Sequence, residues 1–504
     1  MDVVAFLGSL DVATIFLTSA ISLVFLKIVQ RAIRGPRKKL PPGPWRLPVI
    51  GSYHHVRGGP RHHRISDLAK QYGPVMMLKM GQTPTLVVSS PELAREIMKT
   101  QDANFAQRPD HPAAEVVLYG CSNITFSPVG AHWKLLRKMC ALQLVNAKSI
   151  RKFQGLRDKE ALSMIWELQE HARCSSEPVN LTDKIFRTIF DTVSKAAYGE
   201  NYEARDHLFF ISEKLMSRSS FEMGICDLFP KQKWLTKITG TKAKWESLVN
   251  VMDPILDKII SSTKVAPSGF IEGEADNLLS ALLRVMEDGG LTISQVKAVM
   301  LDMIFGGTET SSSTADWALS ELLRKPKLMK RAQDEVRQVV SDNKGCMNET
   351  TIESMKYLKA IVKETLRLHP PTPFLVPREA IRTCEVNGYT IPAGTEVHVN
   401  IWTIMRDPKY WSSPEEFLPD RFLNLNIDFK GFNFEYTPFG SGKRICPGML
   451  LGVASVECML TRLLYHFDLE LPPGTTPETL DMTDTLGFTM KRKNPIIVIP
   501  RIPS

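Results

Sequence analysis

The pattern of apolar and polar positions has a helical period over most of this chain, which is 504 residues long. Amphipathic helices separated by polar links are predicted through most of residues 150–285. A long helix is predicted at Thr292–Arg324, because Thr292 and Gln295 fit a capping box at its start and Pro326 follows its end. The pattern is that of a mainly α-helical protein.

Stretches with a strand pattern are few and short. The predicted strands are Val75–Lys79, Thr85–Val88, Cys384–Pro392 and Thr395–His398. Gly81 and Pro84 separate the first two, and Asn387-Gly388 marks a turn in the third. The segment from Phe105 to about Pro128 has too many polar and helix-breaking residues for a regular element, and long loops of this kind tend to be functional. The predicted fold class is mainly α with small β-sheets.

Two adjacent glycines interrupt the long helix, in the stretch Phe305–Ser311. Each interior glycine costs about 1 kcal/mol relative to alanine, so the pair needs a reason. One reason is close packing against another helix. The other is a groove in which a ligand lies on the backbone, with Thr310 bonding back to the Gly306 carbonyl and bending the helix.

The stretch Phe439–Gly448 reads as a tight loop with three glycines that carries one cysteine, Cys446, to the start of a helix. The apolar run Met449–Phe467 predicts that helix, and Pro447 suits its first position. Helix amides and the positive end of the helix dipole would favour a thiolate at Cys446, with Arg444 two residues upstream. A thiolate held in this way is a candidate metal ligand.

The N-terminal residues have the pattern of a membrane anchor. Val12–Val29 is mostly apolar and, together with the apolar residues of Val3–Leu10, is long enough to cross a bilayer, which needs about 20 residues. A cleaved signal peptide and a surface helix are the alternatives, but the basic residues follow the apolar run instead of preceding it. We expect residues 1–30 to form an anchor, residues 31–45 a basic and proline-rich hinge, and residues 46–504 a cytosolic catalytic domain.

The net charge and the placement of the basic residues indicate which kind of partner the chain contacts. The net charge of +9 suggests nucleic acid, but no basic run is interleaved with aromatic residues. The basic residues crowd beside the apolar run instead, which favours a membrane surface; they are Lys27, Arg31, Arg34, Arg37, Lys38 and Lys39. The eight cysteines have no paired spacing, which fits free thiols in a reducing compartment.

The spacing Phe-x-x-Gly-x-Arg-x-Cys-x-Gly in this loop resembles the haem-binding loop of the cytochromes P450, the haem-thiolate monooxygenases. The resemblance covers essentially the whole chain. It implies a single large cytochrome P450 fold behind an N-terminal transmembrane helix, with haem b as the cofactor. It also implies that Cys446 ligates the iron, that Arg444 pairs with a haem propionate and that Phe439 contacts the haem.

Three further positions resemble haem contacts of the same family. Trp133 and Arg137 form a Trp-x-x-x-Arg pair, which on its own is commonly a surface cation–π contact but matches a pair that contacts the propionates. Arg378 matches a second propionate position. A separate group, Glu364, Arg367 and Arg421, resembles a buried ionic network of the family; its implied role is structural.

The stretch Phe305–Ser311 resembles the family's signature of a small residue, glycine, an acid, threonine and serine. It departs from the usual residues at Gly306, where alanine is more common, and at Glu309, where aspartate is. The resemblance implies that Glu309 and Thr310 relay protons during cleavage of O₂. Reducing equivalents would come from NADPH through a separate NADPH–cytochrome P450 reductase, with cytochrome b5 as a second candidate donor.

An acidic electron-donating partner is expected to dock on a basic face of this chain. The alternative, given equal weight, is that this face is an ordinary solvated surface. The basic residues of this face are Lys134, Arg137, Lys138, Lys443 and Arg444. The expected location is the endoplasmic reticulum membrane, with a single span in membrane lipid and the catalytic domain in the cytosol. No nucleic acid is expected as a partner.

The substrate is expected to be a small apolar molecule, since the loop and hinge motifs resemble the large plant group that makes terpenoids, alkaloids and phenolics. Candidate lining residues are Val117, Phe221, Met300, Ile304, Phe374, Val376 and Phe488. Two alternatives remain open: a haem-thiolate isomerase or ring-forming synthase that needs no reductase, and a non-catalytic haem protein at the membrane.

Overall fold

The computed structural model describes residues 18, 22, 39–145, 147–199, 205–216, 224–263, 277–487 and 489–503. The expected anchor and most of the basic segment lie outside the described residues, as do Phe221 and Phe488. Among the helices within the described ranges, none is both long and apolar enough to cross a membrane.

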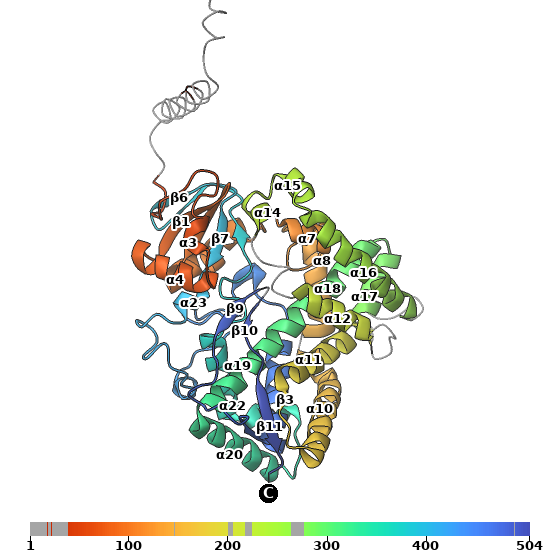
Figure 1. Ribbon diagram of the computed structural model, residues 1–504. Coiled ribbons are helices and arrows are strands. Elements are labelled where there is room, and N and C mark those ends of the chain that lie inside the picture. The colour runs from red at the N-terminus through yellow and green to blue at the C-terminus, as the bar shows by residue number, and fades with distance from the viewer. Residues whose placement is uncertain are drawn as a thin grey trace, which may run out of the picture.

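Helices form most of the body (Figure 1). The sheet that contains β1 (Val75–Met80) and β7 (Glu396–Val399) lies beside α3 and α4, whereas β3 (Val179–Asn180) and β11 (Ile497–Arg501) lie near the C-terminus at the other end of the body. The helices before residue 290 are α3 (Tyr53–Val56), α4 (Arg61–Tyr72), α5 (Pro91–Arg95), α6 (Asp102–Phe105), α7 (Pro112–Val117), α8 (Ala131–Cys140), α9 (Ala147–Lys152), α10 (Gln154–Cys174), α11 (Leu181–Tyr198), α12 (Arg205–Met216), α14 (Ile225–Leu228), α15 (Lys233–Ile238), α16 (Thr241–Ser262) and α17 (Leu278–Glu287). The later helices are α18 (Ile293–Ile304), α19 (Thr310–Arg324), α20 (Pro326–Asp342), α21 (Glu349–Ser354), α22 (Lys356–Leu368), α23 (Ile401–Ile404), α24 (Arg421–Asn424) and α25 (Met449–His466). Three π-helical turns are η1 (Glu96–Thr100), η2 (Ala141–Val145) and η3 (Phe305–Glu309), and η4 (Gly442–Arg444) is a 3₁₀ turn.

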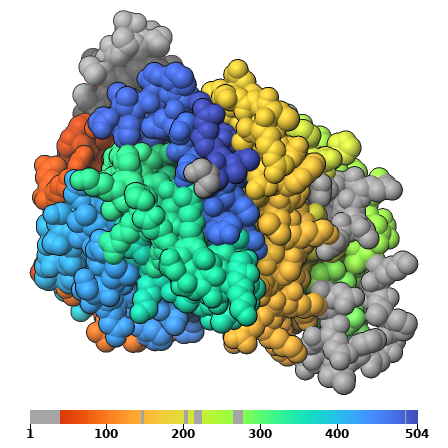
Figure 2. Space-filling model, turned by 90° about the horizontal axis from the view of Figure 1, so that it is seen from below, coloured from red at the N-terminus to blue at the C-terminus, as the bar shows by residue number. Residues whose placement is uncertain are grey.

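Within the described ranges, the strands make one four-stranded, one three-stranded and two two-stranded sheets. They are β1 (Val75–Met80), β2 (Thr83–Val88), β3 (Val179–Asn180), β4 (Arg378–Glu379), β5 (Cys384–Val386), β6 (Tyr389–Ile391), β7 (Glu396–Val399), β8 (Asp468–Glu470), β9 (Asp484–Leu486), β10 (Met490–Arg492) and β11 (Ile497–Arg501). The largest sheet has the order β1-β2-β7-β4, with β2 parallel to β7. Figure 2 shows the C-terminal residues (blue) against the yellow segment that contains β3, as the β3-β11-β8 sheet requires.

Several sequence expectations are confirmed and two are corrected. The predicted hairpin forms around Asn387 and Gly388, both with positive φ. Pro84 lies inside β2 instead of before it; because the pairing with β7 begins only at Thr85, the missing amide of Pro84 breaks no bond of that ladder. The expected loop after Phe105 contains the short helix α7, with a proline at its start.

The apolar core has two large parts. One packs α10, α19, α20, α22 and α25 together, and the other packs α7, α8, α16, α17 and α18. The helical path α18–η3–α19 belongs to both, because α18 packs in the second part and α19 in the first. This path therefore brings its central turn to the boundary between the two.

Candidate active site

A cavity lies at that boundary, between η3 and the first turns of α25. It holds about 1050 Å³ of space free of protein atoms, counting the part open to solvent. Its lining is Ile124, Thr125, Cys140, Val193, Asp302, Met303, Gly306, Gly307, Thr310, Ser311, Thr314, Val362, Leu366, Pro371, Phe439, Cys446, Pro447, Gly448, Leu451, Gly452, Val453, Ser455 and Val456. One wall thus comes from the glycine-bearing middle of the long helix and the other from the cysteine loop.

The long helix forms as expected, with Thr292 and Gln295 in a reciprocal capping box. Its middle is a π-helical turn, η3, and single π turns inside α-helices are frequent at functional sites. The hydroxyl of Thr310 donates to the carbonyl of Gly306 at 2.6 Å. The close approach of α11 supports helix packing as the reason for Gly307, and both glycines line the cavity. A Cβ on Gly307 would come within 2.9 Å of Val193, whereas a Cβ on Gly306 would meet nothing within 4 Å.

The loop that carries Cys446 turns sharply where Gly440 and Gly442 adopt φ of +70° and +73°. A side chain at position 442 is excluded, because a Cβ there would lie 2.1 Å from the Met98 carbonyl oxygen. The amide of Cys446 donates to the carbonyl of Phe439 at 3.0 Å and closes the loop. The following helix begins at Met449, so Pro447 precedes it and is not its first residue.

Two cysteines line the cavity, and their surroundings differ. Burial raises the pKa of the Cys446 thiol, but the amides of Gly448 and Met449 and the charge of Arg137 act in the opposite direction. Burial raises the pKa of Cys140 to about 12, with only Arg137 opposing it. A thiolate is therefore easier to form at Cys446, and a bound metal cation would deprotonate it.

Aromatic and cationic groups surround the end of this loop. The Trp133 ring is buried on α8, with the guanidinium carbons of Arg444 and Arg137 at 4.4 and 5.6 Å from its centroid. Arg137 donates to the Ile445 carbonyl at 2.7 Å and Arg444 to the Ala106 carbonyl at 2.8 Å. The indole N–H of Trp133 is buried without a hydrogen-bond partner among the described residues. The structure thus brings these three expected residues together.

Arg108 belongs to the same group and was not among the sequence candidates. It donates to the carbonyls of Thr125, Val376 and Pro377. Burial lowers its pKa far below the usual value, and Arg444, Arg378 and Arg137 lower it further. Four neighbouring guanidiniums repel one another, so an anionic group placed among them would be stabilised. The sequence signal was an arginine near the start of the long segment after Phe105, which was expected to be a functional loop.

Arg378 is placed beside the loop but already has an acidic partner. It donates to Asp102 at 2.9 Å and to the Ser441 carbonyl at 2.8 Å, and it is buried. Asp102 also accepts from the amide of Lys443 at 2.8 Å. Arg378 therefore ties the cysteine loop to α6, in addition to lying near the other arginines.

Glu309 does not line the cavity, although Thr310 beside it does. Its carboxylate is buried and lies 3.3 Å from Nζ of Lys491 on β10. This is an ion pair without hydrogen-bond geometry, since neither oxygen has a hydrogen-bond partner among the described residues. Burial raises the pKa of Glu309 to about 7, against the opposing charge of Lys491.

The expected ionic network is assembled away from the cavity. Arg367 donates to both oxygens of Glu364, at 2.7 and 2.8 Å, and Arg421 donates to Glu364 at 3.1 Å. The side chains of Glu364 and Arg367 have no exposed surface. Two neighbours of Glu364 on α22, Val362 and Leu366, line the cavity, so this network fixes one of its walls.

The expected substrate-lining residues that the structure describes are not among those that line this cavity. Val117, Met300 and Ile304 are buried in the second part of the core, and Phe374 lines a separate small cavity beside Glu396 and His398. The carbonyl of Val376 accepts from Arg108. Met303, one position along the helix from Ile304, lines the cavity instead.

The residues present fit haem, the cofactor that the loop motif implies. A Cβ on Gly306 or on Gly448 would meet nothing within 4 Å, so both walls are open where a flat group would lie. A thiol lies in one wall, and the unpartnered indole N–H and the group of arginines suit carboxylates at an edge.

Comparisons with known proteins agree with this geometry. Residues 41–499 match the family model described as cytochrome P450. The chain is 45% identical over 497 residues to desmethyl-deoxy-podophyllotoxin synthase of Sinopodophyllum hexandrum, covering 96% of each chain. It is 42% identical over 489 residues to premnaspirodiene oxygenase of Hyoscyamus muticus, covering 95% of this chain and 96% of the other. A solved zebra fish cytochrome P450 with progesterone superposes with a TM-score of 0.76 at 26% identity, covering 88% of this chain and 100% of the other.

Proposed function

The chain belongs to the cytochrome P450 family, whose members are haem-thiolate monooxygenases, and we propose that this one inserts one oxygen atom of O₂ into a small apolar molecule. The observation that carries the proposal is the cavity with a cysteine thiol in one wall and a hydroxyl at a π turn in the other. The overall reaction consumes the substrate, O₂, NADPH and a proton, and yields the oxygenated product, water and NADP⁺.

Cys446 is the proposed iron ligand, with Phe439 in the same wall of the cavity. Arg108, Arg137, Arg444 and the indole N–H of Trp133 are the proposed partners of the haem carboxylates, and Arg378 positions the loop from Asp102. Bound haem supplies activation of O₂, helped by electron donation from the thiolate. The protein supplies position, exclusion of water and protons.

Glu309 and Thr310 are the proposed proton relay. A carboxyl group with a pKa of about 7 can both accept and give a proton near neutral pH. Its partner Lys491 is partly exposed, so a proton can reach Glu309 from solvent by way of the ammonium group. Thr310 holds its hydroxyl at the cavity, one residue along the helix, where it can pass the proton on.

Replacing Thr310 by alanine should raise the release of hydrogen peroxide relative to product, because proton delivery at the cavity is lost while the walls stay in place. Consumption of NADPH, product and peroxide are measured together in a reconstituted system. Thr314→Ala is the matched control, since its hydroxyl makes the same backward bond to a carbonyl, at 2.8 Å, one turn along the helix. Unchanged coupling in Thr310→Ala would show that the relay does not run through this hydroxyl.

The reductase would dock on the basic face of α8 and η4. Lys134, Lys138 and Lys443 are exposed there and Arg137 is half-buried, but Arg444 is buried and contributes no surface. The proposed organisation keeps a membrane anchor in residues 1–30, a hinge in residues 31–45 and the catalytic domain in residues 46–504, at the endoplasmic reticulum membrane. Cytochrome b5 is the second proposed donor for the same face.

The proposed substrate is a plant specialised metabolite of terpenoid, alkaloid or phenolic type. Apolar groups such as Ile124, Val193 and Met303 dominate the lining, which favours a ligand without charge. Relatives of this chain are named for premnaspirodiene, costunolide and desmethyl-deoxy-podophyllotoxin, and all three come from plants.

An isotope experiment tests the proposal. Microsomes that contain the chain and a reductase are screened with such metabolites under ¹⁸O₂, and products are analysed by mass spectrometry. We expect a product that carries one ¹⁸O atom and that forms only with NADPH. Unlabelled product formed equally without NADPH would instead indicate an isomerase or synthase. The absence of substrate-dependent O₂ consumption across the screen would indicate a non-catalytic haem protein.

A further inference from the structure

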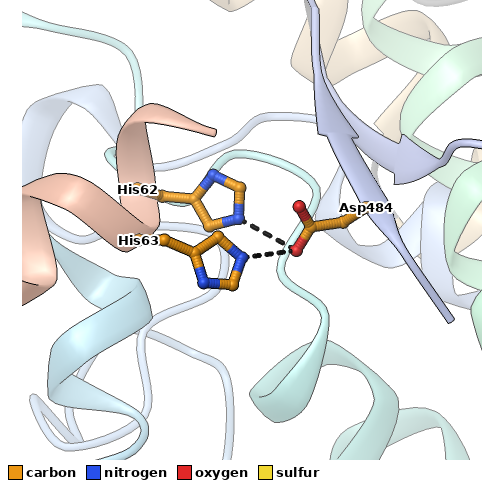
Figure 3. A group of neighbouring side chains, drawn as sticks. All are labelled: His62, His63 and Asp484. Carbon is orange, nitrogen blue, oxygen red and sulfur yellow. Dashed lines mark hydrogen bonds and ion pairs between the residues drawn. The ribbon is translucent and has the colours of Figure 1, made fainter. Parts of the chain in front are cut away.

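Two histidines and an aspartate from distant parts of the chain converge outside the cavity. His62 and His63 are neighbours on α4, and Asp484 is the first residue of β9. Nε2 of His62 lies 3.1 Å from Oδ2 of Asp484, and Nε2 of His63 lies 2.8 Å from the same oxygen (Figure 3). The three atoms that could bind a metal ion, one from each residue, all lie within 4.8 Å of one another.

This arrangement is close to that of three ligands around one cation. Zn²⁺ binds imidazole nitrogen and carboxylate oxygen at about 2.0–2.2 Å, so a tetrahedral ion holds its ligand atoms roughly 3.3–3.4 Å apart. To admit the ion, the two nitrogen–oxygen separations would widen by a few tenths of an ångström, and the two nitrogens, which lie within 4.8 Å of each other, would take up the same spacing. His63 is about half exposed, with 48% of its side chain accessible, and so leaves a route of entry and room for a water as fourth ligand.

A positive charge near this cluster is already balanced. The nearby cation Arg406 is itself paired with Glu415, at 3.2 Å.

We propose that His62, His63 and Asp484 form a binding site for one divalent transition-metal ion, with Zn²⁺ as the cation that best suits two imidazoles and a carboxylate. The ion joins α4 to the β9–β10 hairpin. Lys491 on β10 pairs with Thr485 of β9 across the ladder and makes the ion pair with Glu309. Metal binding therefore restrains the hairpin that holds the partner of Glu309.

Metal binding is measured on the purified full-length holoenzyme, after treatment with EDTA and a check that its haem absorbance is unchanged. The exposed thiols Cys174 and Cys346 are alkylated first, so that they cannot bind the metal. ZnCl₂ is then titrated in competition with a chromophoric chelator, and Mg²⁺ serves as the control cation because it prefers oxygen ligands. Hydrogen exchange of residues 484–492 is recorded with and without Zn²⁺.

We expect one Zn²⁺ per chain and slower exchange in the hairpin. Loss of one ligand in His63→Gln should weaken binding by about 100-fold, since even partners outside the coordination shell change metal affinity by 10–100-fold. Asp484→Asn should do the same. The control His55→Gln should bind as the unchanged chain does, because His54 and His55 are also adjacent but lack a carboxylate partner of this kind among the described residues. Absence of stoichiometric Zn²⁺, or equal binding by all variants, would overturn the proposal.

Discussion

Replacing Glu364 by glutamine is expected to lower the free energy of unfolding by about 3–5 kcal/mol, because two buried guanidiniums then lose their counter-charge. Glu364 has no exposed surface and accepts from Arg367 and Arg421 and from the amide of Leu418. Arg367 is held in turn by the carbonyls of Met405, Pro414 and Glu416. A loss of this size is a large part of the 5–15 kcal/mol that typically stabilises a protein.

The chain contains a matched control for this effect. Glu170 and Arg173 have the same residue types and the same spacing on α10, at 2.6 Å, but both are exposed. Exposed pairs contribute about 0–1 kcal/mol, so Glu170→Gln should leave the thermal midpoint nearly unchanged. Midpoints are compared at one scan rate, together with the yield of haem-loaded protein. Equal midpoints for the two variants would contradict a stabilising role for the buried network.

The local elements that the sequence predicted correctly are those with their own chemical signal. The capping box at Thr292 and the turn at Asn387-Gly388 depend on residues that satisfy their own backbone, so no distant contact is needed. The glycine-rich cysteine loop is predictable for the same reason, since φ near +70° strongly favours glycine. Helix α7 was missed because the proline at its start was taken as a breaker rather than as a first residue.

The sequence predicts the residues of the site that belong to recognisable motifs. It does not predict the contacts that those residues make with distant parts of the chain. Cys446, Trp133, Arg137 and Arg444 come together as their spacing and the family resemblance implied. The ion pair between Glu309 and Lys491 joins a helix to a strand far along the chain, and no local pattern reports such a contact. The described apolar candidates are not among the residues that line this cavity, and Ile304 illustrates why. One position along a helix rotates a side chain by about 100°, which separates Met303 from Ile304.

Replacing Cys446 by serine should abolish monooxygenase activity, because a serine hydroxyl cannot donate charge to iron as a thiolate does. The amides of Gly448 and Met449 and the charge of Arg137 all favour a thiolate at this position. Cys140 is the stringent control, since its thiol also lines the cavity, but it ends α8 and lacks those donors. Serine at either position is smaller and polar, so both variants carry a similar cost in packing.

The central claim is that the sulfur of Cys446, and of no other cysteine, ligates the haem iron. Its most direct test is the difference spectrum of the reduced protein with carbon monoxide, recorded for the unchanged chain, Cys446→Ser and Cys140→Ser at equal haem content. We predict a thiolate-type spectrum for the unchanged chain and for Cys140→Ser, and its complete loss in Cys446→Ser. A thiolate-type spectrum that persists in Cys446→Ser would contradict the claim.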